Sequence, residues 1–366
     1  MKYNWQHENW KNFEYDSSII DEIVIEFALE TGELKGIVNT LAEDIKQDTI
    51  IQFMIDEAIK TSEIEGEFYS RKDIMSSIKN RIGIHPSISH IKDIKARGIG
   101  ELMVEVREQY NTELSENLIK HWHSLLFNNT GTILAGEYRK GNEPMVIVSG
   151  AHGREVIHYE APPSTNVPNE MKDFVNWYNS YNIQSSDIKN TLIKTSIAHL
   201  YFETIHPFED GNGRIGRAIA EKCLAQCLQR PLLMSLSSSI EKDKKSYYDA
   251  LKNAQRTLEI SKWIYFFSKT IVHAQKQAKK TIHFILNKSS FLDKNKSKLN
   301  ERQLKVILKM LDKDGEGFEG GMTAKKYMSI TKISKATATR DLQDLTNKNV
   351  LHVSGFGRSI SYSLTI

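Results

Sequence analysis

The 366-residue sequence predicts a mainly α-helical protein with one small β-hairpin and a separate C-terminal winged helix-turn-helix domain. Apolar residues recur at helical spacing along most of the chain, and they alternate with polar residues in a short stretch between Gly141 and Pro163. Charge is also uneven, because residues 281–366 hold fifteen Lys and Arg against eight Asp and Glu, a net +7, whereas the remainder carries −4.

Most of the chain shows the periodicity of amphipathic helices. The first strong pattern runs from Asp48 to Ile64 and stops at Gly66. Further helices are expected at 91–110, 115–127, 169–181, 186–205, 214–229, 241–258 and 261–279. In the segment 186–205 the apolar residues spread around most of the circumference, which predicts a central, buried helix.

A short hairpin is expected in the middle of the chain. The period changes to two around Val146 and Val148, a turn signal follows at residues 150–153, and a second apolar run occupies 156–159. The double proline Pro162-Pro163 ends the hairpin.

The C-terminal segment has a different order of elements. Helices are expected over 300–311 and 323–328, a third helix opens at Ser334, and two strands lie within 351–364. That order is typical of a winged helix-turn-helix. We therefore expect three parts, an N-terminal helical region over 1–95, a second helical domain over 96–285 and the winged helix over 300–366, with the Lys-rich stretch 287–299 as linker.

Composition indicates a soluble, cytoplasmic protein without a membrane partner. No run of eighteen apolar residues occurs, and the first ten residues are polar and aromatic where a secretion signal would be basic and then apolar. The two cysteines, Cys223 and Cys227, are four residues apart on one predicted helix, so we expect buried free thiols.

The densest group of chemically capable residues is the segment 206–217, HPFEDGNGRIGR. Pro207 disfavours helix at His206, so the buried helix should end there with an imidazole at the mouth of a loop. Gly211 and Gly213 stand just before the next helix. Glycines there allow backbone N–H groups to converge at the positive helix N-terminus, as in anion-binding sites.

Three charged side chains complete this segment. Arg214 and Arg217 are three apart on one helical face, and guanidinium groups suit phosphate oxygens. Asp210 supplies the hard oxygen that Mg²⁺ accepts beside phosphates. The residues themselves predict a metal–polyphosphate site with His206 as general base. The alternative is an ordinary helix-loop-helix turn with capping glycines, a buried histidine and solvated arginines.

The segment resembles the signature of the Fic family, in which His, Phe, an acidic residue, Gly-Asn-Gly and two Arg occur at these spacings. The resemblance covers about 113–268 and implies a Fic catalytic domain over 96–285, a helical bundle whose hairpin Pro144–Tyr159 is a flap that aligns an extended target segment. It implies these roles: His206 as general base, Asp210 as Mg²⁺ ligand, Gly211, Asn212 and Gly213 at the α-phosphate, Arg214 and Arg217 at the outer phosphates, and Phe208 as an anchor in the core.

By this resemblance the chain is a protein adenylyltransferase, which transfers AMP from Mg·ATP to a Ser, Thr or Tyr hydroxyl of a protein, the chain itself included. Two other hypotheses stay open. One is a DNA-binding regulator whose Fic domain senses nucleotide, and the other is a Fic enzyme with another nucleotide donor, because a phosphate loop does not read the base. The resemblance also implies a homodimer.

The helix over about 48–66 ends with two carboxylates, where the helix dipole favours cations. Thr61 and Glu65 are four apart and share a face, and together with Gly66 they resemble the inhibitory motif of Fic proteins. That resemblance implies that Glu65 pairs with Arg217 and displaces the γ-phosphate; within the family the same glutamate can also support removal of AMP. A solvated helix end closed by a glycine cap is the alternative.

The N-terminus is aromatic, with Trp5, Trp10, Phe13 and Tyr15. It resembles the leader of a bacterial Fic subgroup that has a helical N-terminal domain and a C-terminal winged helix. These aromatic residues have two alternative roles, packing against the helical body or recognition.

In the winged helix, Leu342 and Leu345 are expected to face inward. The outer face should carry groups suited to phosphate and groove contacts, with a further one at the wing tip: Lys335, Thr337, Thr339, Arg340 and Arg358. Asp341 and Asp344 interrupt this basic face, and winged helices also bind proteins. DNA binding and protein binding therefore both stay open.

Overall fold

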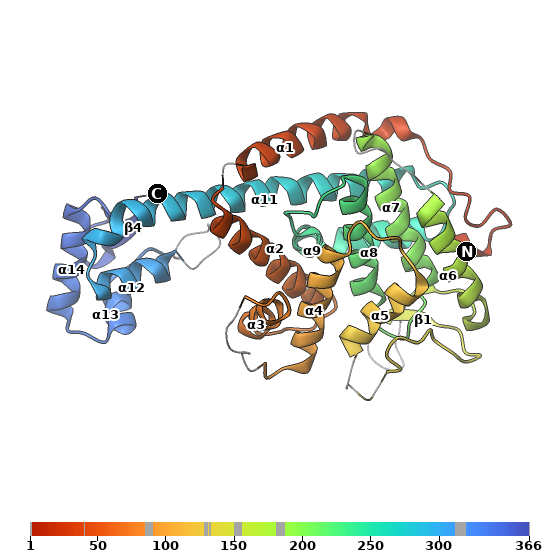
Figure 1. Ribbon diagram of the computed structural model, residues 1–366, viewed down its shortest axis with the longest axis horizontal. Coiled ribbons are helices and arrows are strands. Elements are labelled where there is room, and N and C mark those ends of the chain that lie inside the picture. The colour runs from red at the N-terminus through yellow and green to blue at the C-terminus, as the bar shows by residue number, and fades with distance from the viewer. Residues whose placement is uncertain are drawn as a thin grey trace. The chain divides into compact units, whose positions relative to one another are not determined.

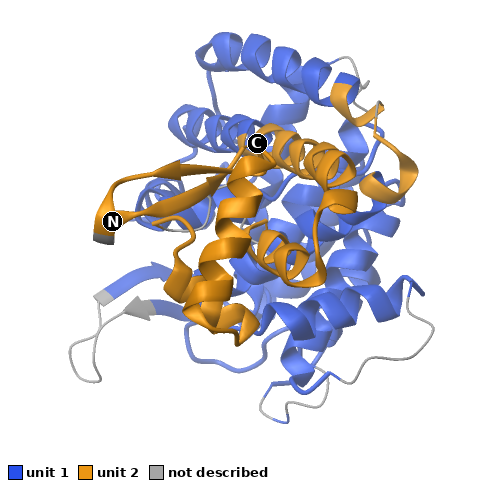
Figure 2. Cartoon of the chain, turned by 90° about the vertical axis from the view of Figure 1, so that its left-hand side faces the viewer, with its two compact units in different colours: residues 1–36, 46–276 blue, residues 37–45, 277–366 orange. Residues whose placement is uncertain are grey.

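The computed structural model describes residues 2–39, 41–84, 91–127, 131, 133–149, 156–180, 187–311 and 320–365. Within these ranges the chain is mainly helical, as predicted, with two small two-stranded sheets. It divides into two compact units (Figure 2), residues 1–36 with 46–276 and residues 37–45 with 277–366. The expected turn at 150–153 lies outside the described residues.

The helices that lie wholly or partly in the first unit are shown in Figure 1. They are α1 (Asp21–Asn39), α2 (Glu43–Ile64), α3 (Arg71–Arg81), α4 (Ile94–Glu108), α5 (Glu116–Phe127), α6 (Val167–Ser180), α7 (Ile188–Ile205), α8 (Asn212–Cys227), α9 (Leu236–Lys242), α10 (Lys244–Ala254) and α11 (Ser261–Asn295). Short 3₁₀ helices lie at η1 (Asn4–Gln6), η2 (Ser17–Ile20) and η3 (Ser164–Asn166).

Two of these helices differ from the sequence prediction. The single helix expected at 241–258 is two helices, because Asp243 ends α9 and its side chain then accepts the N–H of Ser246 at 3.3 Å, capping α10. The stretch 287–299, expected as a linker, is helical through Asn295, and the boundary between the units falls inside α11. The Lys-rich sequence contains neither Pro nor Gly, so nothing in it stops the helix.

The core of the first unit is built around α7, which packs along α8 (Figure 1). Every residue from Thr191 to Ile205 is buried, which confirms the predicted central helix. Cys223 and Cys227 are buried free thiols, as expected. Among the described residues, no helix has the length and apolar character needed to cross a membrane.

The aromatic N-terminus packs on this body. The rings of Trp10 and Phe13 both meet Tyr201 of α7, at centroid distances of 5.4 and 6.0 Å. Trp5 donates its Nε1–H to the carbonyl of Glu160 at 2.8 Å. These contacts favour the packing role of the N-terminal aromatic residues.

The hairpin forms where the alternation predicted it. β1 (Val146–Ser149) pairs antiparallel with β2 (Val156–Glu160), and the register shifts between Ile147 and Val148. Tyr159 is buried and its hydroxyl donates to the carbonyl of Thr204 at 2.6 Å. The hairpin is thereby anchored to the last turn of α7.

The second unit has the predicted order of elements. α12 (Glu301–Met310), α13 (Ala324–Thr331) and α14 (Lys335–Asn347) are followed by the antiparallel strands β3 (Leu351–Ser354) and β4 (Ser361–Leu364), with short 3₁₀ helices at η4 (Lys296–Lys298) and η5 (Gly357–Ser359). Leu342 and Leu345 are buried, as expected. The side chain of Arg358 lies outside the described residues.

One of the two acidic residues of α14, Asp341, does not lie on the outer face as expected. Asp341 is buried, and it accepts hydrogen bonds from Arg302 at 3.1 Å and from the hydroxyl of Tyr327 at 3.0 Å. It shares a face with Leu345, four residues on, and so it faces the core. Asp344 is paired with Lys348 at 2.6 Å. The exposed face of α14 is therefore less acidic than the sequence suggested.

Candidate functional site

The loop between α7 and α8 begins with a sharp turn at His206. Its backbone is left-handed, with φ 49° and ψ 59°, and its N–H closes α7 on the carbonyl of Phe202 at 3.0 Å. Pro207 disfavours any continuation of the helix. The imidazole therefore stands at the helix end, as predicted.

Phe208 holds the loop to the core, as expected. It is fully buried, and its ring stacks on that of His123 at a centroid distance of 4.0 Å. Asn212 closes the loop on the same residue, since its Oδ1 accepts the Phe208 N–H at 2.9 Å and its Nδ2 donates to the Phe208 carbonyl at 2.8 Å. The Asn212 side chain thus braces the loop, which leaves backbone N–H groups as the anion donors.

The N-terminus of α8 has the features of an anion site. Gly211 has φ +80°, and a Cβ on it would lie 2.7 Å from the ring of Phe127, so both backbone conformation and space require glycine. The first N–H groups of a helix have no partner within it and carry partial positive charge. An anion placed above Gly213 would meet these groups directly.

Asp210 precedes this helix end with a largely exposed side chain, at 55 % of its full accessibility. Its Oδ1 accepts the Gly211 N–H at 2.5 Å. In the described part of the chain, no three His, Cys, Asp or Glu side chains gather as a metal cage. One accessible carboxylate beside an anion site fits the way Mg²⁺ binds, through one or two carboxylates together with substrate phosphates.

Arg217 is buried and is held by the end of α2. Its Nε donates to Thr61 Oγ1 at 2.7 Å, and its Nη2 donates to the Thr61 carbonyl at 2.9 Å and to Glu65 Oε1 at 2.7 Å. Burial lowers the pKa of Arg217, but the charge and hydrogen bond of Glu65, together with the nearby Tyr247 and Tyr248, outweigh burial and raise the pKa. The expected pairing of Glu65 with Arg217 is present.

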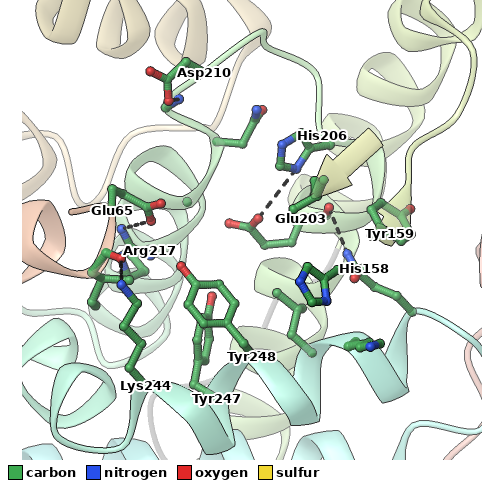
Figure 3. Close-up of a pocket in the computed structure, with 18 of the residues that line it drawn as sticks. Glu65, His158, Tyr159, Glu203, His206, Asp210, Arg217, Lys244, Tyr247 and Tyr248 are labelled. Carbon is green, nitrogen blue, oxygen red and sulfur yellow. Dashed lines mark hydrogen bonds and ion pairs between the residues drawn. The ribbon is translucent and has the colours of Figure 1, made fainter. Parts of the chain in front are cut away.

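Glu65 also covers the anion site. A Cβ built on Gly213 would overlap Glu65 Oε1, so the carboxylate lies against the first turn of α8 (Figure 3). The carbonyl of Ile64 accepts a hydrogen bond from Lys244 of α10. Lys244 supplies the cation that the C-terminus of α2 needs, and Gly66, with φ +80°, turns the chain away.

Arg214 is held by a second carboxylate, which the sequence analysis missed. Its guanidinium pairs with Glu67 and lies 3.4 Å from Asp210 Oδ1, and it is only 4 % exposed. Glu67 is itself fixed by the hydroxyl of Tyr69 at 2.7 Å and by Lys95 Nζ at 3.0 Å. One short segment, 65–67, therefore neutralises both arginines of the loop.

These groups surround one cavity of about 590 Å³. Its walls come from the end of α2, from β1 and β2, from the loop 206–213 and from α10 (Figure 3). The sequence-predicted residues His206, Asp210, Gly211, Asn212, Gly213, Arg217 and Glu65 all line it, together with Glu203, Lys244, Tyr247 and Tyr248, which were not predicted. The cavity thus combines an imidazole, an anion site and an aromatic wall.

The imidazole of His206 is neutral in this environment. Burial lowers the pKa of His206 to about 4, and the charge of Arg139 lowers it further against the raising effects of the Glu203 backbone and Asp210. Glu203 Oε2 lies 3.9 Å from His206 Nδ1, and Glu203 Oε1 is buried without a hydrogen-bond partner among the residues that the structure describes. Burial raises the pKa of Glu203 to about 8, an effect that Arg217 opposes and Glu65 reinforces. At neutral pH the site holds an unprotonated base beside a mainly uncharged acid.

Comparison with known proteins shows that two segments of this chain match family models. Residues 113–224 match the family model described as Fic/DOC family, and residues 3–84 match one described as a domain of unknown function (DUF4172). The chain is 30 % identical over 152 residues to a protein of Aquifex aeolicus (strain VF5) named "Probable protein adenylyltransferase". That match covers 41 % of this chain and 40 % of the relative, so the chain spans about two fifths of the relative's length.

Solved structures share the fold. A Fic family protein from Desulfovibrio desulfuricans G20 has a TM-score of 0.53 at 19 % identity, over 94 % of this chain and 96 % of that chain. A Fic domain containing signaling protein from Bacteroides thetaiotaomicron VPI-5482 has a TM-score of 0.51 at 17 % identity, over 72 % and 97 %. Fic-1 from C. elegans has 0.51 at 18 % identity, over 74 % of each chain.

We expect the buried imidazole to titrate far below an ordinary histidine. In protein labelled with ¹³C at histidine, the His206 signal should have its midpoint at about 4, whereas an ordinary histidine titrates near ~6.5. Loss of one signal in His206→Ala assigns it. A midpoint between 6 and 7 in the folded protein would contradict the buried, Arg139-facing environment.

Proposed function

Because residues 113–224 form a Fic/DOC family domain, we propose that this chain is a protein adenylyltransferase that moves AMP from ATP to a protein hydroxyl group. The observation that carries the proposal is the meeting, in one cavity, of a neutral His206 with the anion-binding N-terminus of α8. A base and a phosphate cradle side by side are the two requirements for attack of a hydroxyl on a phosphoryl group.

The reaction balances with the residues present. His206 takes the proton of the target hydroxyl as its oxygen forms a bond to the α-phosphorus, and the bond from that phosphorus to the bridging oxygen breaks to release pyrophosphate. The α8 N–H groups hold the α-phosphate, and Arg214 and Arg217 hold the outer phosphates once their carboxylate partners leave. Asp210 would hold Mg²⁺, which neutralises phosphate charge.

We further propose that the hairpin presents the target. β1 and β2 pair only with each other among the described strands, so each has a free edge to which an extended segment can add. Tyr159 ties the hairpin to Thr204, two residues before His206. A strand bound at this edge would therefore bring its hydroxyl close to the base.

We propose that the resting site is inhibited by its own carboxylates. Glu65 forms the ion pair that a phosphate oxygen would form with Arg217, and it lies above Gly213, where an anion would bind. A phosphate group and the Glu65 carboxylate compete for the same positive groups. ATP can take the productive position only when Glu65 moves away.

Removal of Glu65 should activate the enzyme. With Mg²⁺ and α-labelled ATP, Glu65→Gly should incorporate label roughly tenfold faster than wild type or more, since a hydrogen bond to a charged group is worth about 1.5–3 kcal/mol. Combining it with His206→Ala should lower the rate by ~10²–10⁴-fold. Label is followed on gels and mass shift by spectrometry.

Glu63→Gly is the matched control, because Glu63 lies on the last turn of α2 but pairs with Lys60 and not with the loop arginines. Equal activity of wild type, Glu63→Gly and Glu65→Gly would contradict the proposed inhibition by Glu65. Label from another nucleoside triphosphate alone would identify a different donor. If labelled protein loses its label over time in wild type but keeps it in Glu65→Gly, Glu65 supports the removal of AMP.

Glu67 should act as a second restraint, through Arg214. Glu67→Gln keeps the size of the side chain but removes the charge that pairs with Arg214. We expect it to raise the labelling rate when added to Glu65→Gly and to lower the KM for ATP, because Arg214 becomes available to phosphate. Glu63→Gln in the same background is the control; an unchanged KM would show that the Arg214 pair does not restrain nucleotide binding.

A second candidate activity concerns the second unit, which we propose is a winged helix that binds DNA. The inward position of Asp341 favours it, because Lys335, Thr339 and Arg340 remain exposed on α14. Protein binding by this face and the homodimer implied by the resemblance stay predictions.

If α14 binds duplex DNA, affinity should fall steeply between 50 and 200 mM salt, roughly tenfold or more for a few phosphate contacts. Lys335→Gln with Arg340→Gln should flatten that salt dependence in a fluorescence anisotropy titration. A DNA affinity that depends neither on salt nor on the two substitutions would rule out DNA binding through α14.

A further inference from the structure

Arg139 is a buried arginine without an acidic partner among the described residues. Its side chain is 4 % exposed, and its hydrogen bonds go to carbonyls and one hydroxyl. Burial lowers the pKa of Arg139 to about 10. An unpaired buried charge is costly, so its surroundings must compensate for the water it has lost.

The compensation comes from the C-terminal end of α7. Nε donates to the carbonyl of His206 at 2.7 Å, Nη2 donates to that of Ile205 at 3.2 Å, and the Arg139 backbone N–H donates to the Pro207 carbonyl at 2.9 Å. The last carbonyls of a helix have no partner within it and carry partial negative charge. The guanidinium therefore caps α7 at its C-terminal residues, Ile205 and His206.

The same guanidinium reaches the exit of the hairpin. Nη2 also donates to the Pro162 carbonyl at 2.6 Å, and Nη1 donates to Ser164 Oγ of η3 at 2.9 Å. Arg139 thus joins the segment that leaves β2 to the backbone of His206.

His206 needs such support. A left-handed backbone in a residue other than glycine is strained and persists only where surrounding contacts hold it. The His206 N–H and carbonyl are both engaged, the first by Phe202 and the second by Arg139. Arg139 does not line the cavity of the site, so it can act on the reaction only through the groups that it holds, chiefly the backbone of His206.

We propose that Arg139 is a positioning residue, which clamps the carbonyls of Ile205 and His206 and so sets the place of the imidazole relative to the anion site and the hairpin. The inference rests on the proposed function in one respect, that His206 is the base. Its charge has a second effect, since it helps to keep the pKa of His206 low. Among the described residues, Glu203 and Asp210 are the other charged or titratable groups that act on the imidazole.

The test compares three substitutions in the full-length Glu65→Gly protein. Arg139→Gln removes both the positive charge and the planar set of N–H donors of the guanidinium group. Arg139→Lys keeps the positive charge but loses that planar set of donors. Arg107→Gln is the matched control, because Arg107 is also largely buried and donates to a backbone carbonyl, that of Leu232 at 2.7 Å, without reaching the loop. Each protein is measured for melting temperature, His206 pKa by ¹³C NMR, kcat, and KM for ATP.

In Arg139→Gln we expect the His206 pKa to rise from about 4 toward the ordinary value, and kcat to fall by ~10²-fold, as misplacement of a reacting group by about 1 Å can cause. KM for ATP should stay unchanged, because Arg139 does not line the cavity. In Arg139→Lys the pKa should stay low while kcat falls. Arg107→Gln should change neither quantity.

The proposal is overturned if Arg139→Gln loses stability like Arg107→Gln and leaves both kcat and the His206 pKa where they were. Should Arg139→Gln not fold, Arg139→Lys decides, since a kcat equal to that of Arg107→Gln excludes the clamp. The NMR measurement needs no turnover. A shifted His206 pKa in a protein that never transfers AMP would support the clamp and reject the proposed reaction.

Discussion

The turn between α7 and α8 brings the negative end of one helix next to the positive end of another, and surrounding side chains of opposite charge compensate both ends. The carbonyls at the end of α7 are met by Arg139, and the N–H groups at the start of α8 face Glu65. Both helices are buried along most of their length, so bulk water cannot screen either end effectively. The hairpin and α2 are held where they are partly because they supply groups to these ends.

The anion site is filled by the protein's own carboxylates, with consequences for energy and for chemistry. Arg217 and Arg214 are 1 % and 4 % exposed and would be costly to bury without an anion. Glu65 and Glu67 provide that anion from a chain segment outside the loop. If a nucleotide displaces them, as proposed, one set of charge-assisted hydrogen bonds replaces another, and small changes in segment 65–67 would shift the balance between the two states.

The same burial prepares the base. Desolvation and Arg139 keep His206 unprotonated, and desolvation keeps Glu203 mainly uncharged at neutral pH. A neutral imidazole can accept a proton without first losing one, which is what a base for a hydroxyl group requires. The groups that position His206 and the groups that set its pKa are therefore partly the same.

Sequence periodicity determined the helical class, the buried α7, the hairpin and the order of elements in the second unit, because these follow from local spacing of apolar residues. Segment 206–217 likewise supplied the proposed base and the proposed anion loop, whose residues are neighbours in the chain. The sequence analysis did not identify Glu67 and Arg139 as residues of the site. Their partners Arg214 and His206 lie 147 and 67 residues away in sequence, and no local spacing predicts such pairs. The linker at 287–299 and the outward position of Asp341 were wrong for related reasons, since helix continuation and core contacts override polar composition. The residues suited to the proposed chemistry are neighbours in one segment of the sequence, so the sequence alone identified them. Which charged groups surround these residues was decided only by tertiary packing, because electrostatic interactions act through space and burial strengthens them.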